Sequence, residues 1–295
     1  MSTLFSLVSN PHYQYKHVLT KLIQHHTGVP YQDIILHYHD EVSSDMVSRI
    51  DSDYHAYAHD KKPLEYIMRQ VAFLGNQFVI DSRAMIPRPE TEYMIQAVVE
   101  MIDKRGSTPY YLLDLGCGCG VLGLSVAFLS INKPILVSSR DISADAVALT
   151  GENIQLYQQK LPNISFQTRV SNGLAGLDSD EVLHQTWTDN PLVIVCNYPY
   201  IPDETFDANV DESAKIWEPR LAFVAGKDGL DLYRRLFAEL IHYKLTHATL
   251  FLEMMTWQMD ILDREFGINH GGVRYLEVVK TFHFNIIIVK VQFKG

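Results

Sequence analysis

An asparagine, two tyrosines and a proline follow an apolar run, and their types suit the binding of a planar nitrogen group. The apolar run is Val193–Cys196, and Asn197, Tyr198, Pro199 and Tyr200 come directly after it. The Asn197 side-chain oxygen and a backbone carbonyl just after it can each accept one N–H of an amide or exocyclic amine. These two bonds would turn the developing lone pair of that nitrogen toward an electrophile, and Tyr200 could stack on the planar group. The alternative is a loop that only closes a strand.

A glycine-rich turn forms a second candidate site. The apolar run Tyr110–Leu113 ends in Asp114, glycines follow at Gly116, Gly118 and Gly120, and an apolar segment with helical spacing comes next. This order predicts a buried strand, a tight turn and the first helix of a nucleotide-binding α/β unit. The spacing matches neither the dinucleotide-binding G-x-G-x-x-G pattern nor a phosphate-binding P-loop. A plain strand-to-helix turn is the alternative.

Asp141 and the three cysteines complete the set of candidate residues. Asp141 follows the next predicted strand about 20 residues beyond the glycines, where an acid can bind a ribose diol. A turn that caps the following helix at Ser143 is the alternative for Asp141. Cys117 and Cys119 lie between the glycines and only Cys196 remains. We therefore predict neither a disulfide framework nor a metal site.

From residue 111 onward, strands and helices alternate, which predicts a parallel, doubly wound α/β sheet. The predicted strands are 111–114, 135–139, 164–168, 191–196, 248–253, 273–279 and 284–293. The predicted helices are 121–130, 143–159, 229–243 and 256–265. The last two strands lie close together, so a short antiparallel return completes a seven-stranded sheet.

The first part of the chain is predicted to be a small helical domain, residues 1–72, ahead of a second domain at 73–295. A helical face holds Tyr15, Val18, Leu19, Leu22 and Ile23. Ile34 and Ile35 suggest a short second helix, and Ser44 or Asp45 is expected to cap a third.

Residues 73–90 are predicted to form a hairpin, turning at Gly75–Asn76, and a linker. Prolines on both sides of Arg88 restrict the backbone there, and a helix is expected to start at Thr91. Glu90 and Glu92 suit a helix N-terminus, but no structural reason is evident for Arg88. Arg88 is therefore a candidate substrate-binding residue.

Charge and composition narrow the possible classes of function. The formal net charge of −10 disfavours non-specific binding to nucleic-acid backbones. No window approaches the roughly 18 apolar residues of a membrane span, and the N-terminus lacks the pattern of a signal peptide. Together with the three cysteines, this predicts a cytoplasmic protein in a reducing compartment.

Taken together, these motifs resemble those of the release factor glutamine methyltransferases, the protein-(glutamine-N5) methyltransferases. The resemblance covers almost the whole chain, and its most specific run is Pro87–Glu92, Pro-Arg-Pro-Glu-Thr-Glu. It also includes the stretches Pro63–Ile67, Phe73–Gly75, Gly116–Gly120, Asp141–Ser143, Asn197–Tyr200, Glu218–Arg220 and Ala225–Leu230.

The resemblance implies a Rossmann-like, seven-stranded class I methyltransferase domain that uses S-adenosyl-L-methionine (SAM). The implied SAM-binding residues are Asp114, Gly116, Cys117, Gly118, Cys119, Gly120, Asp141, Asn172, Gly173 and Asn197. Asn197, Tyr198, Pro199 and Tyr200 would form the catalytic loop and bind the substrate together with Arg88. The implied substrate and partner is a class I peptide chain release factor, methylated on the glutamine of its Gly-Gly-Gln motif. We expect a monomer that binds neither membrane nor nucleic acid.

Several departures from the family pattern keep other functions open, and one of them is the lack of the usual acidic and basic residues at 280–285. Tyr198 replaces the first proline of the family's Asn-Pro-Pro-Tyr loop, and Asn172 stands where an acid near the adenine amine is common. Glu253–Met255 lacks the glycine expected after the acid of the fifth strand. The alternatives are an N6-adenine methyltransferase acting on nucleic acid, because the same loop serves that chemistry, and an inactive SAM-binding homologue.

Overall fold

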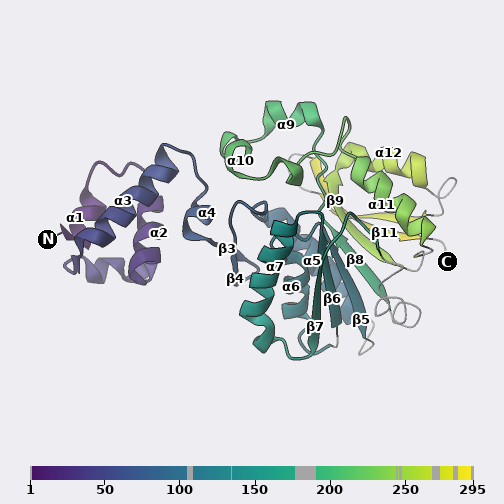
Figure 1. Ribbon diagram of the computed structural model, residues 1–295, viewed down its shortest axis with the longest axis horizontal. Coiled ribbons are helices and arrows are strands. Elements are labelled where there is room, and N and C mark those ends of the chain that lie inside the picture. The colour runs from purple at the N-terminus through teal and green to yellow at the C-terminus, as the bar shows by residue number, and fades with distance from the viewer. Residues whose placement is uncertain are drawn as a thin grey trace. The chain divides into compact units, whose positions relative to one another are not determined.

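The computed structural model describes residues 2–104, 109–133, 135–176, 191–243, 245, 248–267, 273–281 and 285–293 (Figure 1). The chain divides into two compact units, Met1–Gln70 with Asp211–Trp217, and Val71–Val210 with Glu218–Gly295. The place of Asp211–Trp217 in the first unit was not expected, because the sequence pattern put the whole of 73–295 in one domain.

The first unit packs short helices around one apolar core. Its elements are β1 Ser2–Thr3, α1 Leu4–Ser9, α2 Lys16–Thr27, η1 Tyr31–His37, β2 Glu41–Val42, α3 Ser44–Ala58, α4 Leu64–Met68 and α10 Glu212–Trp217. The apolar face of α2 is buried as predicted and consists of Val18, Leu19, Leu22 and Ile23. It packs in one cluster with Ile50 and Tyr54 of α3. The indole nitrogen of Trp217 donates to the carbonyl of Asp60, which ties α10 to the end of α3 (2.8 Å).

Two local predictions in this unit need correction, whereas the short helix expected at Ile34 and Ile35 is present. Ser43, rather than Ser44 or Asp45, caps α3, because its hydroxyl accepts the backbone N–H of Met46 (3.2 Å). The segment with Ile34 and Ile35 forms the 3-10 helix η1, in which Ile34 is buried and Ile35 is 68% exposed. Tyr15 precedes α2 and is 44% exposed, so it does not share the buried face.

The second unit contains the predicted seven-stranded, mostly parallel sheet. Its strands are β5 Tyr110–Leu115, β6 Ile135–Asp141, β7 Ile164–Val170, β8 Leu192–Cys196, β9 Thr249–Met255, β10 Val273–Thr281 and β11 Ile286–Phe293. Their order is β10-β11-β9-β8-β5-β6-β7. The five strands from β5 to β9 pair in parallel, and β11 runs antiparallel to both of its neighbours. The predicted fold class and the antiparallel return are confirmed.

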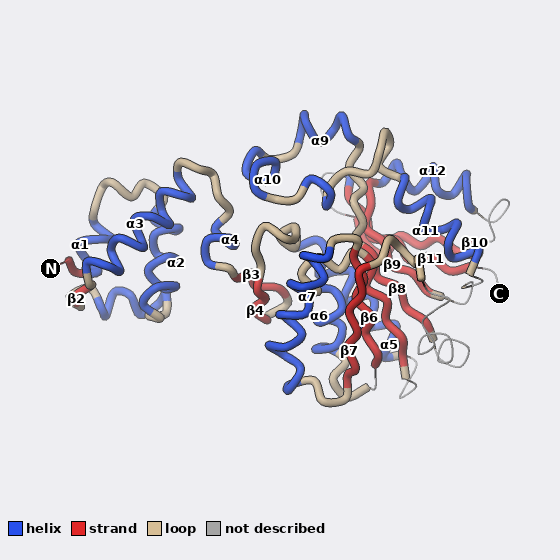
Figure 2. The backbone as a smooth tube through the Cα atoms, viewed as in Figure 1, coloured by secondary structure: helices blue, strands red, loops and turns tan. Residues whose placement is uncertain are grey.

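Helices cover both faces of this sheet (Figure 2). The helices are α5 Glu92–Asp103, α6 Val121–Leu129, α7 Ala144–Tyr157, α9 Asp203–Asn209, α11 Asp231–His242 and α12 Thr256–Phe266, with the 3-10 helices η2 Pro89–Thr91, η3 Gln158–Lys160 and η5 Arg220–Ala222. Figures 1 and 2 show α6 and α7 on one face and α11 and α12 on the other. Within the described ranges, no helix has both the length and the apolar character needed to cross a membrane.

The strand order places a topological switch point between β5 and β8. The chain proceeds from β5 through β6 to β7 on one side, and then returns to β8 and β9 on the other side of β5. Every residue of β5 and β8 is buried, which explains their near-continuous apolar sequences. In open α/β sheets, ligands bind outside the carboxyl ends of the strands at such a switch point.

A β-hairpin leads into the segment before the sheet. It pairs β3 Gln70–Phe73 with β4 Asn76–Val79. The hairpin was predicted, but its turn lies one residue earlier than expected, at Leu74 and Gly75. Both residues have positive φ angles, 45° and 77°, as a type I′ turn requires.

Candidate functional site

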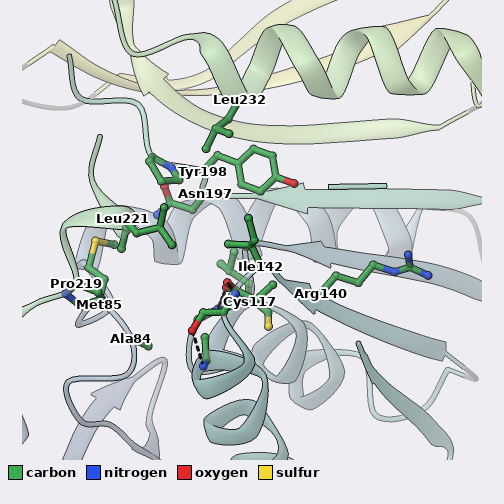
Figure 3. Close-up of a pocket in the computed structure, with 18 of the residues that line it drawn as sticks. Ala84, Met85, Cys117, Arg140, Ile142, Asn197, Tyr198, Pro219, Leu221 and Leu232 are labelled. Atoms are coloured by element: carbon green, nitrogen blue, oxygen red, sulfur yellow. Dashed lines mark hydrogen bonds between the residues drawn. The ribbon is translucent and has the colours of Figure 1, made fainter. Parts of the chain in front are cut away.

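A cavity lies at the carboxyl ends of β5, β6, β7 and β8 (Figure 3). The predicted site residues that line it are Gly116, Cys117, Gly118, Cys119, Asp141, Asn172, Gly173, Asn197, Tyr198 and Pro199. Four further predicted residues, Asp114, Gly120, Tyr200 and Arg88, are not among its lining residues. The fold therefore gathers most of the candidates from four separate strands into one place.

The glycine turn follows β5 and forms one wall of this cavity. The backbone N–H groups of Gly116 and Cys117 both donate to the carbonyl of Arg140, at 2.8 and 3.0 Å. Gly116, Gly118 and Gly120 all have positive φ angles. Gly116 is also closely packed, since a Cβ there would lie 2.9 Å from the Tyr198 ring. Glycine at this position thus satisfies both the backbone conformation and the close approach of a side chain.

Two polar side chains of helix α7, Thr150 and Asn153, donate hydrogen bonds to the glycine turn. The Thr150 hydroxyl donates to the carbonyl of Gly118 (3.0 Å). The Asn153 amide nitrogen donates to the carbonyls of Cys119 and Val79, and its oxygen accepts the N–H of Val79. Asn153 is fully buried, so these bonds hold the turn and the hairpin against one helix.

Asp141 lies at the end of β6 with both carboxylate oxygens engaged. One oxygen accepts the N–H of Gly118 (3.0 Å) and the other accepts the N–H of Ser143 (2.9 Å). Asp141 therefore forms the capping turn at Ser143 and also lines the cavity. Each carboxylate oxygen has a further lone pair with which to accept a hydroxyl.

Asp114 occupies a different environment, buried at the end of β5. Its carboxylate is fully buried and accepts the N–H of Gly123 (2.9 Å), while its second oxygen has no hydrogen-bond partner among the described residues. Burial raises the pKa of Asp114 to about 7; the Gly123 N–H opposes this rise and the charge of Asp141 adds to it. Asp114 thus contacts the first turn of α6 rather than the cavity.

Asn197 enters the cavity from the end of β8, and its amide nitrogen is held by a buried network. This nitrogen donates to the Thr91 hydroxyl (3.2 Å), which donates in turn to the Glu253 carboxylate (2.9 Å). The Tyr200 hydroxyl donates to the other oxygen of Glu253 (2.9 Å). Burial raises the pKa of Glu253, and hydrogen bonds from Thr91, Tyr200 and Asn197 oppose that rise.

Tyr198, which stands in place of the family proline, is partly buried and packs against the core of the second unit. Its ring lies against Gly116 and is tilted beside the Tyr233 ring, with the two centroids 6.0 Å apart. Burial raises the pKa of the Tyr198 hydroxyl well above its usual value, so the ring is neutral. The tyrosine is therefore accommodated beside the turn that carries Gly116, where it lines the cavity.

Arg88 has a structural partner that the sequence did not reveal. Its guanidinium donates to the Glu218 carboxylate (2.7 Å), and the other oxygen of Glu218 accepts the N–H of Ile86 (2.9 Å). The Glu218 side chain is 2% exposed, whereas that of Arg88 is 37% exposed. A buried carboxylate needs a counter-charge, so the expectation that Arg88 has no structural role is wrong.

The far wall of the cavity combines the end of β7 with helix α11. Arg235 donates to the carbonyl of Asn172 and pairs with Glu239, both at 2.7 Å. Glu239 also accepts the N–H of Leu174 (2.8 Å). The backbones of Asn172 and Leu174, on either side of Gly173, are thus fixed by charged side chains of α11, which the sequence analysis did not single out.

Several other lining residues were also missed. They are Arg83, Ala84, Met85, Pro87, Thr91, Val121, Leu122, Arg140, Ile142, Ser143, Ala146, Ser171, Pro219, Leu221, Ala222, Leu232, Arg235, Leu236 and Glu239. Most are apolar and carry no signal beyond their place beside a motif. Among the described residues, no cluster of histidine, cysteine or carboxylate side chains could hold a metal ion.

Comparison with known proteins supports the fold assignment. A family model described as the methyltransferase small domain matches residues 91–205. The N-terminal domain of human METTL16 has a similar fold, with a TM-score of 0.52 at 12% identity over 97% of this chain and 98% of that one. The family model covers part of the second unit, and the neighbour shows that the chain has the class I methyltransferase fold.

Curated relatives show a more specific sequence similarity. The chain is 33% identical to the release factor glutamine methyltransferase of Clostridium acetobutylicum over 62% of its own length and 59% of the relative's. It is 30% identical to the ribosomal protein uL3 glutamine methyltransferase of Francisella tularensis, over 69% and 60%. The chain thus spans about three fifths of each relative's length. The resemblance to release factor glutamine methyltransferases is confirmed.

Proposed function

We propose that the protein transfers a methyl group from SAM to the side-chain amide nitrogen of a glutamine, the one in the Gly-Gly-Gln motif of a class I release factor. The observation that carries this proposal is the meeting of two motifs: Asn197 and Pro199 line the same cavity as the glycine turn and Asp141. A cofactor at the turn and a planar amide at Asn197 would therefore lie next to each other.

The residues present fit SAM. The backbone of Gly116–Cys119 forms the wall above the first turn of α6, Asp141 offers free lone pairs to ribose hydroxyls, and Asn172 and Gly173 border the far end. Two of the predicted contacts take indirect roles in this proposal, because Asp114 and Gly120 support the turn without lining the cavity. When bound, SAM supplies an electrophilic methyl group on a sulfonium.

The protein's own contribution is to position the amide. The oxygen of Asn197 and the backbone carbonyl of Tyr198 would each accept one N–H of the substrate, which orients the nitrogen toward the methyl group. Pro199 would restrict the loop, and Tyr200 would border the planar group. Because the proton on nitrogen can leave after transfer, no general base is needed.

Recognition of the remainder of the substrate is assigned to two further parts of the chain. The guanidinium of Arg88, which is partly exposed beside Glu218, remains a candidate contact for the substrate backbone. The helical unit, residues 1–72 in the sequence-based division, is proposed to bind the body of the release factor. A protein with this substrate would work in the cytoplasm, and we expect it to act as a monomer.

A ribosomal protein is the second candidate substrate, because the Francisella relative is a uL3 glutamine methyltransferase. Adenine methylation of nucleic acid is the weaker alternative, since the net charge of −10 opposes binding to a phosphate backbone. An inactive SAM-binding homologue is the third possibility and is suggested by Tyr198 and Asn172.

Mass spectrometry of a methylation reaction tests the proposal. The purified protein is incubated with SAM and a class I release factor, or with ribosomal protein uL3, or with adenine-containing nucleic acid. We expect the mass of one added CH₂ on the Gly-Gly-Gln peptide. The product should disappear with Asn197→Ala and persist with Asn209→Ala, which changes an exposed asparagine of α9. Product on another substrate, or SAM binding without any product, would refute the release factor assignment.

A further inference from the structure

Glu253 forms the base of a hydrogen-bonded network beneath the catalytic loop. It lies near the end of β9, is 2% exposed, and receives the hydroxyls of Thr91 and Tyr200 on its two oxygens. Folding of α5 does not explain Thr91, because its side chain makes no capping bond at the start of that helix. Two polar side chains thus converge on a buried carboxylate immediately behind Asn197.

The direction of each hydrogen bond in this network follows from the number of protons available. The Thr91 hydroxyl has a single proton and donates it to the Glu253 carboxyl. Toward Asn197, 3.2 Å away, the same hydroxyl can therefore only accept. The amide nitrogen of Asn197 must face Thr91, because the amide oxygen has no proton to donate.

We propose that Glu253 is a positioning residue: through Thr91 it fixes the side-chain amide of Asn197 with its nitrogen inward and its oxygen available to the substrate. This inference rests on the proposed function and deepens it by naming what selects the substrate. With its oxygen forward, Asn197 accepts an N–H and thus favours a primary amide. With the amide rotated by half a turn, it would present N–H groups and favour a carboxylate.

The network therefore distinguishes glutamine from glutamate. A glutamate placed between the Asn197 oxygen and the Tyr198 carbonyl would bring its carboxylate oxygens against two other hydrogen-bond acceptors. Its negative charge would then have no partner. An N-methylated glutamine retains only one N–H, so the same two acceptors disfavour a second transfer. Glu253, which does not line the cavity, would act on both choices through its effect on the Asn197 amide.

Four variants separate this role from a general effect on stability. Glu253→Gln is close to isosteric, but its new amide can donate to Thr91, which frees the Thr91 proton to bond the Asn197 oxygen and reverses the network. Thr91→Val breaks the connection, whereas Thr91→Ser retains the hydroxyl and should rescue it. Thr249→Val is the matched control, because Thr249 is a buried threonine at the other end of β9.

The first measurement needs no substrate. Exchange of the Asn197 side-chain amide protons with solvent is followed by NMR in the full chain, the signals being assigned by their loss in Asn197→Ala. In the wild type, Thr91→Ser and Thr249→Val, one proton should exchange about 10-fold more slowly than in Thr91→Val and Glu253→Gln. Equal exchange in all five proteins would overturn the proposal. The two disruptive variants give independent answers if one of them fails to fold.

The second measurement compares two versions of one release factor, with Gly-Gly-Gln and with Gly-Gly-Glu. Affinities are measured with S-adenosylhomocysteine present, so that no transfer occurs, and their ratio cancels contacts made by the rest of the factor. The wild type and Thr249→Val should prefer the glutamine form by about 10-fold or more. Glu253→Gln should reduce or invert this preference, and an unchanged ratio would overturn the positioning role. If the wild type binds neither form, the release factor assignment fails, while the exchange measurement still decides the orientation of Asn197.

Discussion

Replacing Asp114 with asparagine is expected to remove a pH-dependent loss of stability from the second unit. The Asp114 carboxyl is completely buried, and burial raises its pKa from 3.8 to about 7. The neighbouring charge of Asp141 adds to this rise and the N–H of Gly123 opposes it. An asparagine at this position keeps an oxygen for the Gly123 N–H and introduces no charge.

The sign and size of the effect follow from proton linkage. The folded state holds the proton more tightly than the unfolded chain, so the stability from protonated Asp114 is fully present below about pH 4. It is lost as the pH rises through about 7, at about 1.4 kcal/mol per pH unit between the two pKa values. Between about pH 5 and pH 8, the wild type should lose on the order of 2 to 3 kcal/mol that Asp114→Asn retains.

Urea titrations at several pH values measure this difference. Hydrogen exchange of the β5 peptide, Tyr110–Leu115, reports the second unit separately from the first. The free energy of unfolding of the wild type should fall relative to that of Asp114→Asn as the pH rises, and the gap should level off above about pH 8. Parallel pH curves for the two proteins would refute the raised pKa and the reasoning from burial.

Three further outcomes are expected. Arg88→Ala should destabilise the second unit by about 1 to 3 kcal/mol in urea unfolding, because it leaves Glu218 buried without its counter-charge. Adding Glu218→Gln should recover part of that loss, and strictly additive effects of the two substitutions would contradict the pairing. Asn153→Ala should cost about 2 to 3 kcal/mol and weaken SAM binding in calorimetry, since it orphans the N–H of Val79 and a carbonyl of the glycine turn. Tyr198→Pro, although it restores the family residue, should lower the thermal midpoint because it empties the space beside Tyr233; an equal or higher midpoint would show that the ring is dispensable.

Most of the sheet could be predicted because its strands carry strong local signals. β5 and β8 are buried along their whole length, so their apolar character appears directly in the sequence. The short helices α9 and α10 escaped prediction, since a segment of six or seven residues shows little periodicity. The assignment of α10 to the first unit depends on contacts distant in sequence, such as that between Trp217 and Asp60.

Within the site, residues that follow a strand were predictable, whereas residues that reach it from elsewhere were not. Gly116, Asp141 and Asn197 each follow a buried run, and that position indicated a ligand site. Arg235 lies in the middle of an amphipathic helix, where an arginine is ordinarily a solvated surface residue. Its role toward Asn172 becomes visible only when α11 is packed against the end of β7.

The run Pro87–Glu92 shows why the most specific part of the resemblance need not touch the reacting groups. Arg88 pairs with Glu218, Thr91 bonds Glu253, and Glu92 accepts the N–H of Leu74 at the tip of the hairpin (3.1 Å). Each contact joins the run to a different segment of the second unit. Of the three side chains, only Thr91 also hydrogen-bonds Asn197. The run thus supports the segment around Asn197 through Thr91.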